Sequence, residues 1–296
     1  MTDRVIDISQ QGAALRVRNA QLVITLSDGQ SETMPMDDLG VIVVSHPAVS
    51  YSQSVFIELL RQGGAFVVCN ERFLPVGMLL PLAANYIQAE RIAAQVNATL
   101  PVKKQIWRRI VEAKVEAQGA LLRRLRGSDS GIAAMSRRVL SGDSTNIEAQ
   151  AARRYWPLLF DDPSFRREFE AADQNRLLNY GYAVLRAITA RGLCAAGLHL
   201  SIGVHHHNRY DPFCLADDLM EPMRPIVDRA VAAIVAKQGP EAPLDSAAKT
   251  ALIGALQERF ECNGEVRTLF DIANRLGSVV ANTFSGRKSS LHFPKL

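Results

Sequence analysis

Three consecutive histidines precede a tight acidic cluster in the stretch GVHHHNRYDPFCLADDLMEPMRP, which runs from Gly203 to Pro225. Imidazole nitrogens and carboxylate oxygens together suit a divalent cation of intermediate hardness such as Mn²⁺, or Mg²⁺ that keeps several waters. Chemistry that needs such a cation at neutral pH is usually hydrolysis or group transfer at phosphorus or carbonyl centres. The stretch therefore indicates metal-assisted chemistry of that class. Its candidate residues are His205, His206, His207, Asp217, Asp218 and Glu221.

The spacing of the two later acids permits two interpretations. Asp218 and Glu221 lie three residues apart, so on a helix both carboxylates face one side and can approach one cation. Asp-x-x-Glu is equally a normal capping pattern at a helix start, and Pro222 and Pro225 restrict how the segment continues. Asp217 is either an acceptor that orients a ligand or a cap. Of three adjacent histidines in a loop, at most two can serve one site.

A further acid, Glu148, lies in GDSTNIEAQAARRYW at the start of a predicted helix. Thr145-x-x-Glu148 matches a capping box, in which the glutamate accepts a hydrogen bond from a free backbone N–H group. The alternative is that Glu148 is a distant ligand of the same cation. From spacing alone, capping is the stronger interpretation.

The elements that must position these residues fall into two groups. In the first eighty residues, ALRVRNAQLVITL alternates apolar and polar side chains, and LGVIVVSHP is a β-branched run, both typical of strands. GGAFVVCNERFLPVGMLL repeats this strand pattern, and SQSVFIELLRQG predicts one amphipathic helix that ends at Gly63. We predict an α+β protein whose residues 1–80 form a small β-rich domain.

From about Asn85 the apolar residues recur three and four apart, as in helices. Pro81 interrupts an apolar stretch, so we predict a linker at residues 81–88 and a larger all-α catalytic domain at residues 89–296. The short basic tail after Gly286 is expected to be mobile. The predicted helical segments include NYIQAERIAAQVNA, VKKQIWRRIVEAKVEAQGALLRRLRG, DQNRLLNYGYAVLRAITARGLCAAG, MRPIVDRAVAAIVAKQG, AAKTALIGALQERFE and LFDIANRLGSVVANTFSG.

Composition bounds the class of protein. The chain has 296 residues, of which 48% are hydrophobic and 22% are charged, which is typical of soluble globular proteins. No apolar run reaches the roughly 18 residues of a membrane-spanning helix, and the N-terminus has no signal core, so a cytoplasmic protein is expected. The four cysteines form no C-x-x-C pair, which argues against a disulfide framework or a thiolate zinc site.

Positive charge is concentrated in one part of the chain. The net charge is +4, but residues 86–167 hold fifteen Lys and Arg against eight Asp and Glu. Such a local excess suits a polyanionic partner, although a solvated helical face has the same pattern.

Several segments resemble the CRISPR-associated integrase, the catalytic subunit of the spacer-acquisition complex, in its type II form. The resemblance covers the whole chain. It is carried by NIEAQAARRYW around Glu148, DQNRLLNYGYAVLRA from Asp173, and the histidine stretch, with VIVVSHPAVSYS and GGAFVVCNERFLPVG nearer the N-terminus. It implies an N-terminal β-domain that dimerises and a helical domain that carries a metal.

The resemblance also implies the site residues. A Glu, a His and a second acid of the family's metal site fall on Glu148, His206 and Glu221, which would bind Mg²⁺ or Mn²⁺. The family pattern of Gly, two apolar residues and His selects His206, and His205 is the alternative. Asp218 matches a position that is acidic in many members and would act through water or orient a ligand.

The implied reaction is attack by the 3′-OH of a captured DNA fragment on a phosphodiester at the border of a repeat array. The implied partners are double-stranded DNA, a second copy of the chain and a small second adaptation subunit. The type II effector nuclease and an accessory adaptation protein are further implied partners. Candidates for phosphate contacts are Arg108, Arg109, Arg123, Arg124, Arg126, Arg137, Arg138, Arg153 and Arg154.

Two other functions compete with this one. A non-catalytic DNA-binding scaffold would have the same fold and a dead site. A zinc hydrolase would use the histidine triplet, but the chain lacks the H-E-x-x-H spacing that lets two imidazoles converge from one helix.

Overall fold

The computed structural model describes residues 4–71 and 75–296. In this part of the chain, the first eighty residues form two four-stranded sheets. One has the order β1 (Arg4–Ile8), β5 (Leu39–Val44), β7 (Ala65–Cys69) and β8 (Pro75–Leu79), in which the first three are parallel and β8 is antiparallel to β7. The other has the order β4 (Ser31–Pro35), β3 (Gln21–Thr25), β2 (Ala14–Arg18) and β6 (Ser50–Tyr51).

The predicted strands and the predicted helix of this region are confirmed. The β-branched run LGVIVV forms β5, whose six residues are all buried, as expected for a central strand of a covered sheet. The amphipathic segment forms α1 (Gln53–Arg61), which buries Val55 and Leu59. Residues 72–74 of the segment GGAFVVCNERFLPVGMLL lie outside the described residues.

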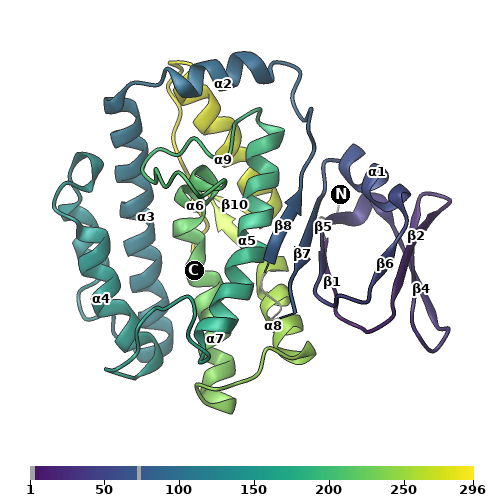
Figure 1. Ribbon diagram of the computed structural model, residues 1–296. Helices are drawn as coiled ribbons and strands as arrows, with labels where there is room; N and C mark the ends of the chain where they lie inside the picture. Colours follow the sequence, from purple (N-terminus) through teal and green to yellow (C-terminus); the bar gives the residue numbers. More distant parts are fainter. Residues whose placement is uncertain (1–3, 72–74) are drawn as a thin grey trace.

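Helices dominate the chain beyond β8, and the predicted α+β class is confirmed. Figure 1 shows the sheets at one side of the molecule, α3 and α4 at the other, and α5 between them. The helices are α2 (Gln88–Val96), α3 (Leu100–Arg126), α4 (Ile147–Phe160), α5 (Asn175–Ala195), α6 (Cys214–Met220), α7 (Arg224–Gln238), α8 (Ser246–Gln257) and α9 (Leu269–Phe284). Short 3₁₀ turns lie at η1 (Met36–Asp38), η2 (Ala133–Arg138), η3 (Ser141–Asp143) and η4 (Glu221–Met223).

One hairpin departs from the all-α expectation. The segment predicted as a helix through Glu261 ends at Gln257, and β9 (Arg259–Cys262) then pairs with β10 (Glu265–Thr268). Between them Asn263 and Gly264 both adopt positive φ, 53° and 79°. Asn-Gly is a strong hairpin signal because both residues tolerate this conformation. The Asn-Gly pair therefore predicted the hairpin, but the helical spacing before it led to the prediction of a helix through Glu261.

The C-terminal tail, expected to be mobile, is packed against the body. Leu291 and Phe293 are partly buried against the hydrophobic core. The backbone N–H of Lys295 donates to the carbonyl of Glu261 in β9. The two apolar side chains explain the difference, since a tail judged by its basic residues alone appears solvated.

The long helix α5 is the centre of the fold. It contacts β5, β7 and β8 on one side and α6, α7, α8 and α9 elsewhere. Sixteen of its residues are buried, in keeping with its apolar sequence. Within the described residues, none of the helices has both the length and the hydropathy that crossing a lipid bilayer requires.

Candidate active site

Two glutamates that lie far apart in the chain converge on one lysine. Glu148 comes from the first turn of α4, and Glu221 begins η4 directly after α6. Lys114 reaches them from the middle of α3, with its Nζ 2.5 Å from Glu148 Oε1 and 2.6 Å from Glu221 Oε2. The two carboxylates therefore face one cation-sized position.

The start of α4 shows that capping does not explain Glu148. The carboxylate of Asp143 accepts hydrogen bonds from the backbone N–H groups of Ile147, at 2.8 Å, and Glu148, at 3.0 Å. The N-cap residue Asn146 makes no side-chain capping bond. The capping-box interpretation is wrong, because Asp143 rather than Thr145 accepts from the N–H of Glu148, and the Glu148 carboxylate binds Lys114 rather than a backbone N–H group.

Asp218 organises the loop that carries the histidines. It lies inside α6, not at a helix start, and its side chain is fully buried. Its carboxylate accepts from the backbone N–H groups of Val204, His205 and His206 at 2.7, 3.0 and 3.2 Å. Gly203 permits this closeness, since a Cβ there would lie 2.9 Å from Asp218 Oδ2. Asp218 thus acts as an orienting group and caps no helix.

The structure distinguishes the three histidines. His206 Nδ1 lies 2.5 Å from Asp218 Oδ1, which leaves its Nε2 for another partner. A carboxylate on one ring nitrogen that directs the other nitrogen outward is a common arrangement for a metal-binding imidazole. His205 instead stacks flat on Trp107, with ring centroids 4.0 Å apart. His207 is exposed. The geometry favours His206 over its alternative, His205.

The charges around Glu221 keep it ionised. Burial alone would raise the pKa of Glu221, but Arg224 and Lys114 outweigh it and lower the pKa to about 2. Arg224 Nε lies 2.9 Å from Glu221 Oε1. The hydrogen bond to Asp218 raises the pKa of His206 against partial burial, and the charge of Glu221 adds to the rise.

Asp217 does not face the two glutamates' lysine but forms a two-point ion pair with Arg186, at 2.7 and 2.9 Å.

The residues fit a divalent cation in chemical type. As the side chains stand, no three His, Cys, Asp or Glu side chains of the described residues gather closely enough to hold a metal. Two carboxylates nevertheless converge on a cation, and buried Glu221 Oε2 has no aligned hydrogen-bond donor among the described residues. Together with His206 Nε2, which the bond to Asp218 leaves available, this donor set suits Mg²⁺ or Mn²⁺.

Several site residues escaped the sequence prediction. Lys114 follows Ile110 and Val111 and precedes Val115, all buried, so a lysine on the apolar face of α3 was a readable signal. Trp107 lies about two helical turns before Lys114 on that face. Arg224 and Arg186 had no distinctive spacing, because their roles depend on contacts between different helices.

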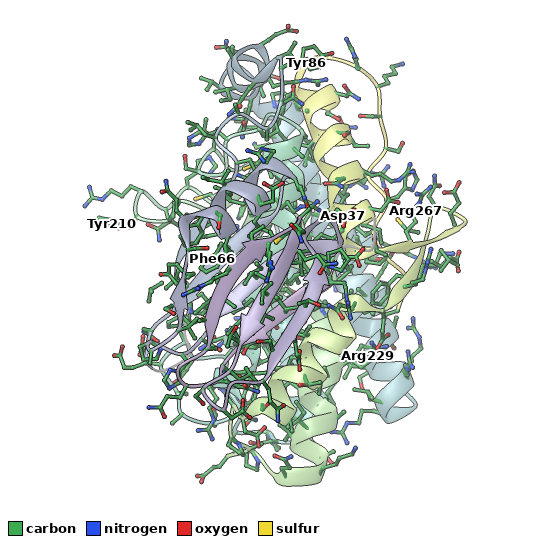
Figure 2. The ribbon with its side chains drawn as sticks, turned by 90° about the vertical axis from the view of Figure 1, so that its right-hand side faces the viewer. Asp37, Phe66, Tyr86, Tyr210, Arg229 and Arg267 are labelled. Carbon is green, nitrogen blue, oxygen red and sulfur yellow. The ribbon has the colours of Figure 1, made fainter. Side chains whose placement is uncertain are left out.

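Some of the candidate phosphate-binding arginines are engaged with groups of the chain itself, and others have no ion pair among the described residues. Arg108 and Arg109 pair with Glu112, and Arg123 pairs with Asp129. Arg126 donates to the carbonyls of Leu158 and Leu159. Exposed arginines for which the described residues provide no ion pair are Arg124, Arg137, Arg138, Arg153 and Arg154, the last of which contacts only the sulfur of Met135. In Figure 2, Tyr210 on the histidine loop projects away from the body, and its side chain is exposed.

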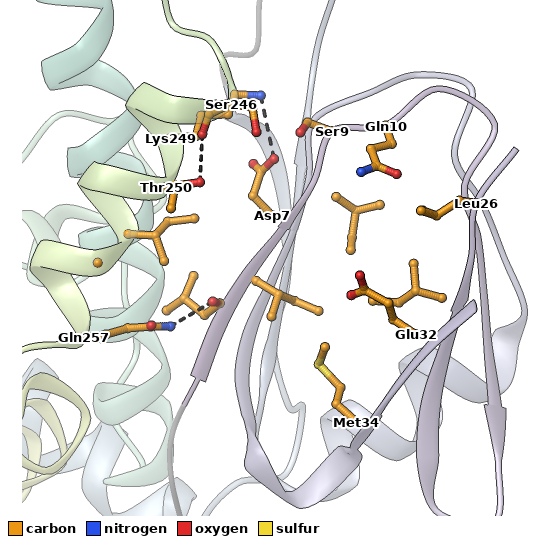
Figure 3. Close-up of a pocket in the computed structure, with 16 residues that line it drawn as sticks. Asp7, Ser9, Gln10, Leu26, Glu32, Met34, Ser246, Lys249, Thr250 and Gln257 are labelled. Atoms are coloured by element: carbon orange, nitrogen blue, oxygen red, sulfur yellow. Dashed lines mark hydrogen bonds and ion pairs between the residues drawn. The ribbon is translucent and has the colours of Figure 1, made fainter. Parts of the chain in front are cut away.

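A separate hollow of about 400 Å³ lies between the β-rich part and α8. Figure 3 shows side chains from β1, β3 and β4 on one wall and Lys249, Thr250 and Gln257 on the other. No predicted site residue lines it. Two polar contacts join its walls: Gln257 Nε2 donates to the carbonyl of Val5 at 2.8 Å, and Lys249 Nζ lies 3.7 Å from Asp7.

Comparison with known proteins gives consistent matches. The family model described as CRISPR associated protein Cas1 matches residues 6–243. A protein named CRISPR-associated endonuclease Cas1, from Neisseria meningitidis serogroup C (strain 8013), is 33% identical over 97% of this chain and 94% of its own length.

Two solved structures share the fold. A casposase bound to integration product superposes with a TM-score of 0.80 at 18% identity, covering 97% of this chain and 92% of that one. A Cas6-RT-Cas1–Cas2 complex matches with a TM-score of 0.74 at 16% identity, covering 98% of this chain and 36% of that one.

Proposed function

This chain belongs to the Cas1 family of CRISPR-associated proteins, and from that premise we propose that it is a metal-dependent DNA integrase and endonuclease of the type II form. Its reaction is the insertion of captured DNA fragments as new spacers into a repeat array. The 3′-OH of the fragment forms a new bond to phosphorus while a P–O3′ bond of the repeat breaks. One phosphodiester replaces another, so no ATP is needed.

One observation carries the proposal. Glu148 and Glu221 come from segments 73 positions apart in the chain and lie within 2.6 Å of one shared cation, the Lys114 ammonium. Two carboxylates that converge on one cation position are a usual way of holding the divalent metal of phosphoryl transfer. The names of the relatives, an endonuclease and a casposase, agree in reaction class.

Glu148, Glu221 and His206 would hold Mg²⁺ or Mn²⁺, which supplies charge neutralisation at phosphorus and a lower pKa for the attacking hydroxyl. Asp218 fixes the ring of His206 through Nδ1 and so leaves Nε2 as the nitrogen available to the metal. Arg224 holds Glu221 from the opposite side. Water in place of the 3′-OH gives endonuclease activity at the same centre.

The DNA partner is accommodated by positive charge in the helical part. Exposed arginines of η2 and α4, namely Arg137, Arg138 and Arg153, suit duplex phosphates, whose contacts position DNA without carrying base information. The Cas1–Cas2 assembly among the structural matches supports a small second adaptation subunit as partner. A homodimer, the effector nuclease and an accessory protein complete the proposed set, all acting in the cytoplasm.

The test uses single alanine variants of Glu148, His206 and Glu221. We expect each to lower strand transfer of a labelled fragment into a supercoiled repeat-bearing plasmid by at least 100-fold, because each removes one ligand. Glu90→Ala, an exposed acid on α2, is the matched control and should keep wild-type activity. EDTA should abolish the reaction, and Mg²⁺ or Mn²⁺ should restore it.

Other outcomes point to the competing functions. Full activity of Glu148→Ala would contradict the proposed site, and an active His206→Ala beside an inactive His205→Ala would reassign the imidazole. Rescue by Zn²⁺ alone would favour a hydrolase. DNA binding by the wild type without any strand transfer would favour a scaffold.

A further inference from the structure

Lys114 occupies an unusual position for a lysine. Its residue exposure is 8%, on the face of α3 that carries Val111, Val115 and Gln118 into the core. A buried ammonium is stable only beside carboxylates or other acceptors. Here it has two such partners, Glu148 and Glu221, from two different elements.

The charges at the site balance without a metal. Glu148 and Glu221 bring two negative charges, and Lys114 and Arg224 bring two positive charges. Arg224 contacts the other oxygen of Glu221, Oε1. The position between the two carboxylates is therefore held by Lys114.

A divalent cation and this ammonium cannot share the position. An Mg²⁺ ion lies about 2.1 Å from its carboxylate oxygens. Placed between Glu148 Oε1 and Glu221 Oε2, it would occupy the volume in which Lys114 Nζ now lies, 2.5 and 2.6 Å from the same oxygens. The two positive charges would also repel each other.

We infer that Lys114 is a positioning residue that substitutes for the metal in the metal-free protein, so that metal binding must displace its ammonium from Glu148 and Glu221. The inference rests on the metal site proposed above. Lys114 keeps the two carboxylates together and neutralised before the metal arrives. In doing so it competes with the metal and lowers its apparent affinity.

The test measures metal binding by the purified full-length protein. Free Mn²⁺ is followed by electron paramagnetic resonance at pH 8 for wild type, Lys114→Met and the control Lys104→Met, an exposed lysine of the same helix. Methionine keeps most of the side-chain volume and removes the charge. We expect the Kd for Mn²⁺ to fall at least tenfold in Lys114→Met and to stay within twofold in Lys104→Met. An unchanged or higher Kd in folded Lys114→Met would overturn the inference.

A second measurement needs no variant. Reductive methylation of the wild type, read by mass spectrometry, should leave Lys114 unmodified in EDTA and modify it when Mn²⁺ displaces it. Equal protection with and without bound Mn²⁺ would contradict displacement.

Failure of the inference differs from failure of the metal site. If Glu148→Gln and Glu221→Gln no longer bind Mn²⁺ while Lys114→Met has the Kd of the wild type, only the proposed role of Lys114 is contradicted. If the wild type binds no Mn²⁺, the metal site itself falls and the inference with it.

Discussion

At the residue scale, the site depends on buried polar groups that hold one another in place. Asp218 binds three backbone N–H groups and one imidazole, so a single carboxylate sets both the loop path and the direction of His206. Behind Glu221 a second buried acid, Asp228, accepts a hydrogen bond from Tyr155 at 2.7 Å and another from Tyr182. Arg224 lies 4.5 Å from the ring centre of Tyr182 and links this network to Glu221.

Asp228 should make stability depend on pH. Burial raises its pKa to about 6, although both tyrosine hydroxyls act in the opposite direction. Because an unfolded aspartate titrates near ~3.9, the folded state holds a proton between about pH 4 and 6 that the unfolded state lacks. The free energy of unfolding should therefore fall as the pH rises through this window. Relative to Asp228→Asn, the wild type should lose roughly 3 kcal/mol between pH 4 and 7, measured by urea denaturation.

The control for this experiment is Glu170→Gln, which removes one exposed carboxylate and corrects for net charge. A difference between wild type and Asp228→Asn that does not change with pH would contradict a raised pKa in the folded state.

At the element scale, the crossing of α5 and α9 sets how closely the central helices pack. A Cβ on Gly192 would lie 2.6 Å from the carbonyl carbon of Ala273, and a Cβ on Gly277 would lie 2.7 Å from the carbonyl oxygen of Gly192. Both neighbours are backbone atoms, which cannot move aside without shifting a helix. Since α5 also contacts α6 and α7, this crossing supports the elements next to Glu221.

Gly192→Ala should destabilise the protein by about 1–3 kcal/mol, the usual range for overpacking. Gly254→Ala in α8 is the matched control, because nothing lies within 4 Å of a Cβ there. Since alanine is the better helix former, that variant should be neutral or more stable by up to about 1 kcal/mol. Thermal unfolding of the two variants gives the comparison, and equal stability would contradict a backbone clash at α5.

At the scale of the whole molecule, the β-rich part and the helices share one hydrophobic core. Val41, Val43 and Val67 from the sheet belong to the same buried cluster as Leu185 and Ile188 of α5. A cluster of polar side chains joins the two parts beside the hollow in Figure 3. In it Asp7 of β1 accepts from Ser45 and from Tyr180 of α5, and lies 3.7 Å from Lys249 Nζ of α8.

Asp7→Ala should therefore destabilise the helical part as well as the sheet. Removing one partner from a buried ionic group typically costs about 3–5 kcal/mol. Trp107 and Trp156 both lie in the helices, so tryptophan fluorescence reports on that part while circular dichroism reports on all of it. We expect both transitions to move together to lower temperature, whereas the exposed control Asp37→Ala should change stability by at most about 0.5 kcal/mol. A shift in only one signal would mean that the parts unfold independently.

Much of this protein was determined by the sequence itself. The alternation before residue 80 and the three-and-four spacing after it predicted strands, helices and the α+β class, because these periods reflect contacts within one element. The stretch from Gly203 to Pro225 indicated a cation site through residue types alone. The same spacing left capping and ligation open for Glu148 and Asp218, since one carboxylate can do either.

Only the tertiary structure decided between those alternatives. Asp143 caps α4, Asp218 binds the histidine loop, and Glu148 meets Glu221 at Lys114. These contacts join residues from α3, α4, α6 and η4, and their distances depend on how the helices pack rather than on any local period. The spacing within α3 could show that Lys114 is buried, but it could not show its partners, because Glu148 and Glu221 reach it only once the helices have packed.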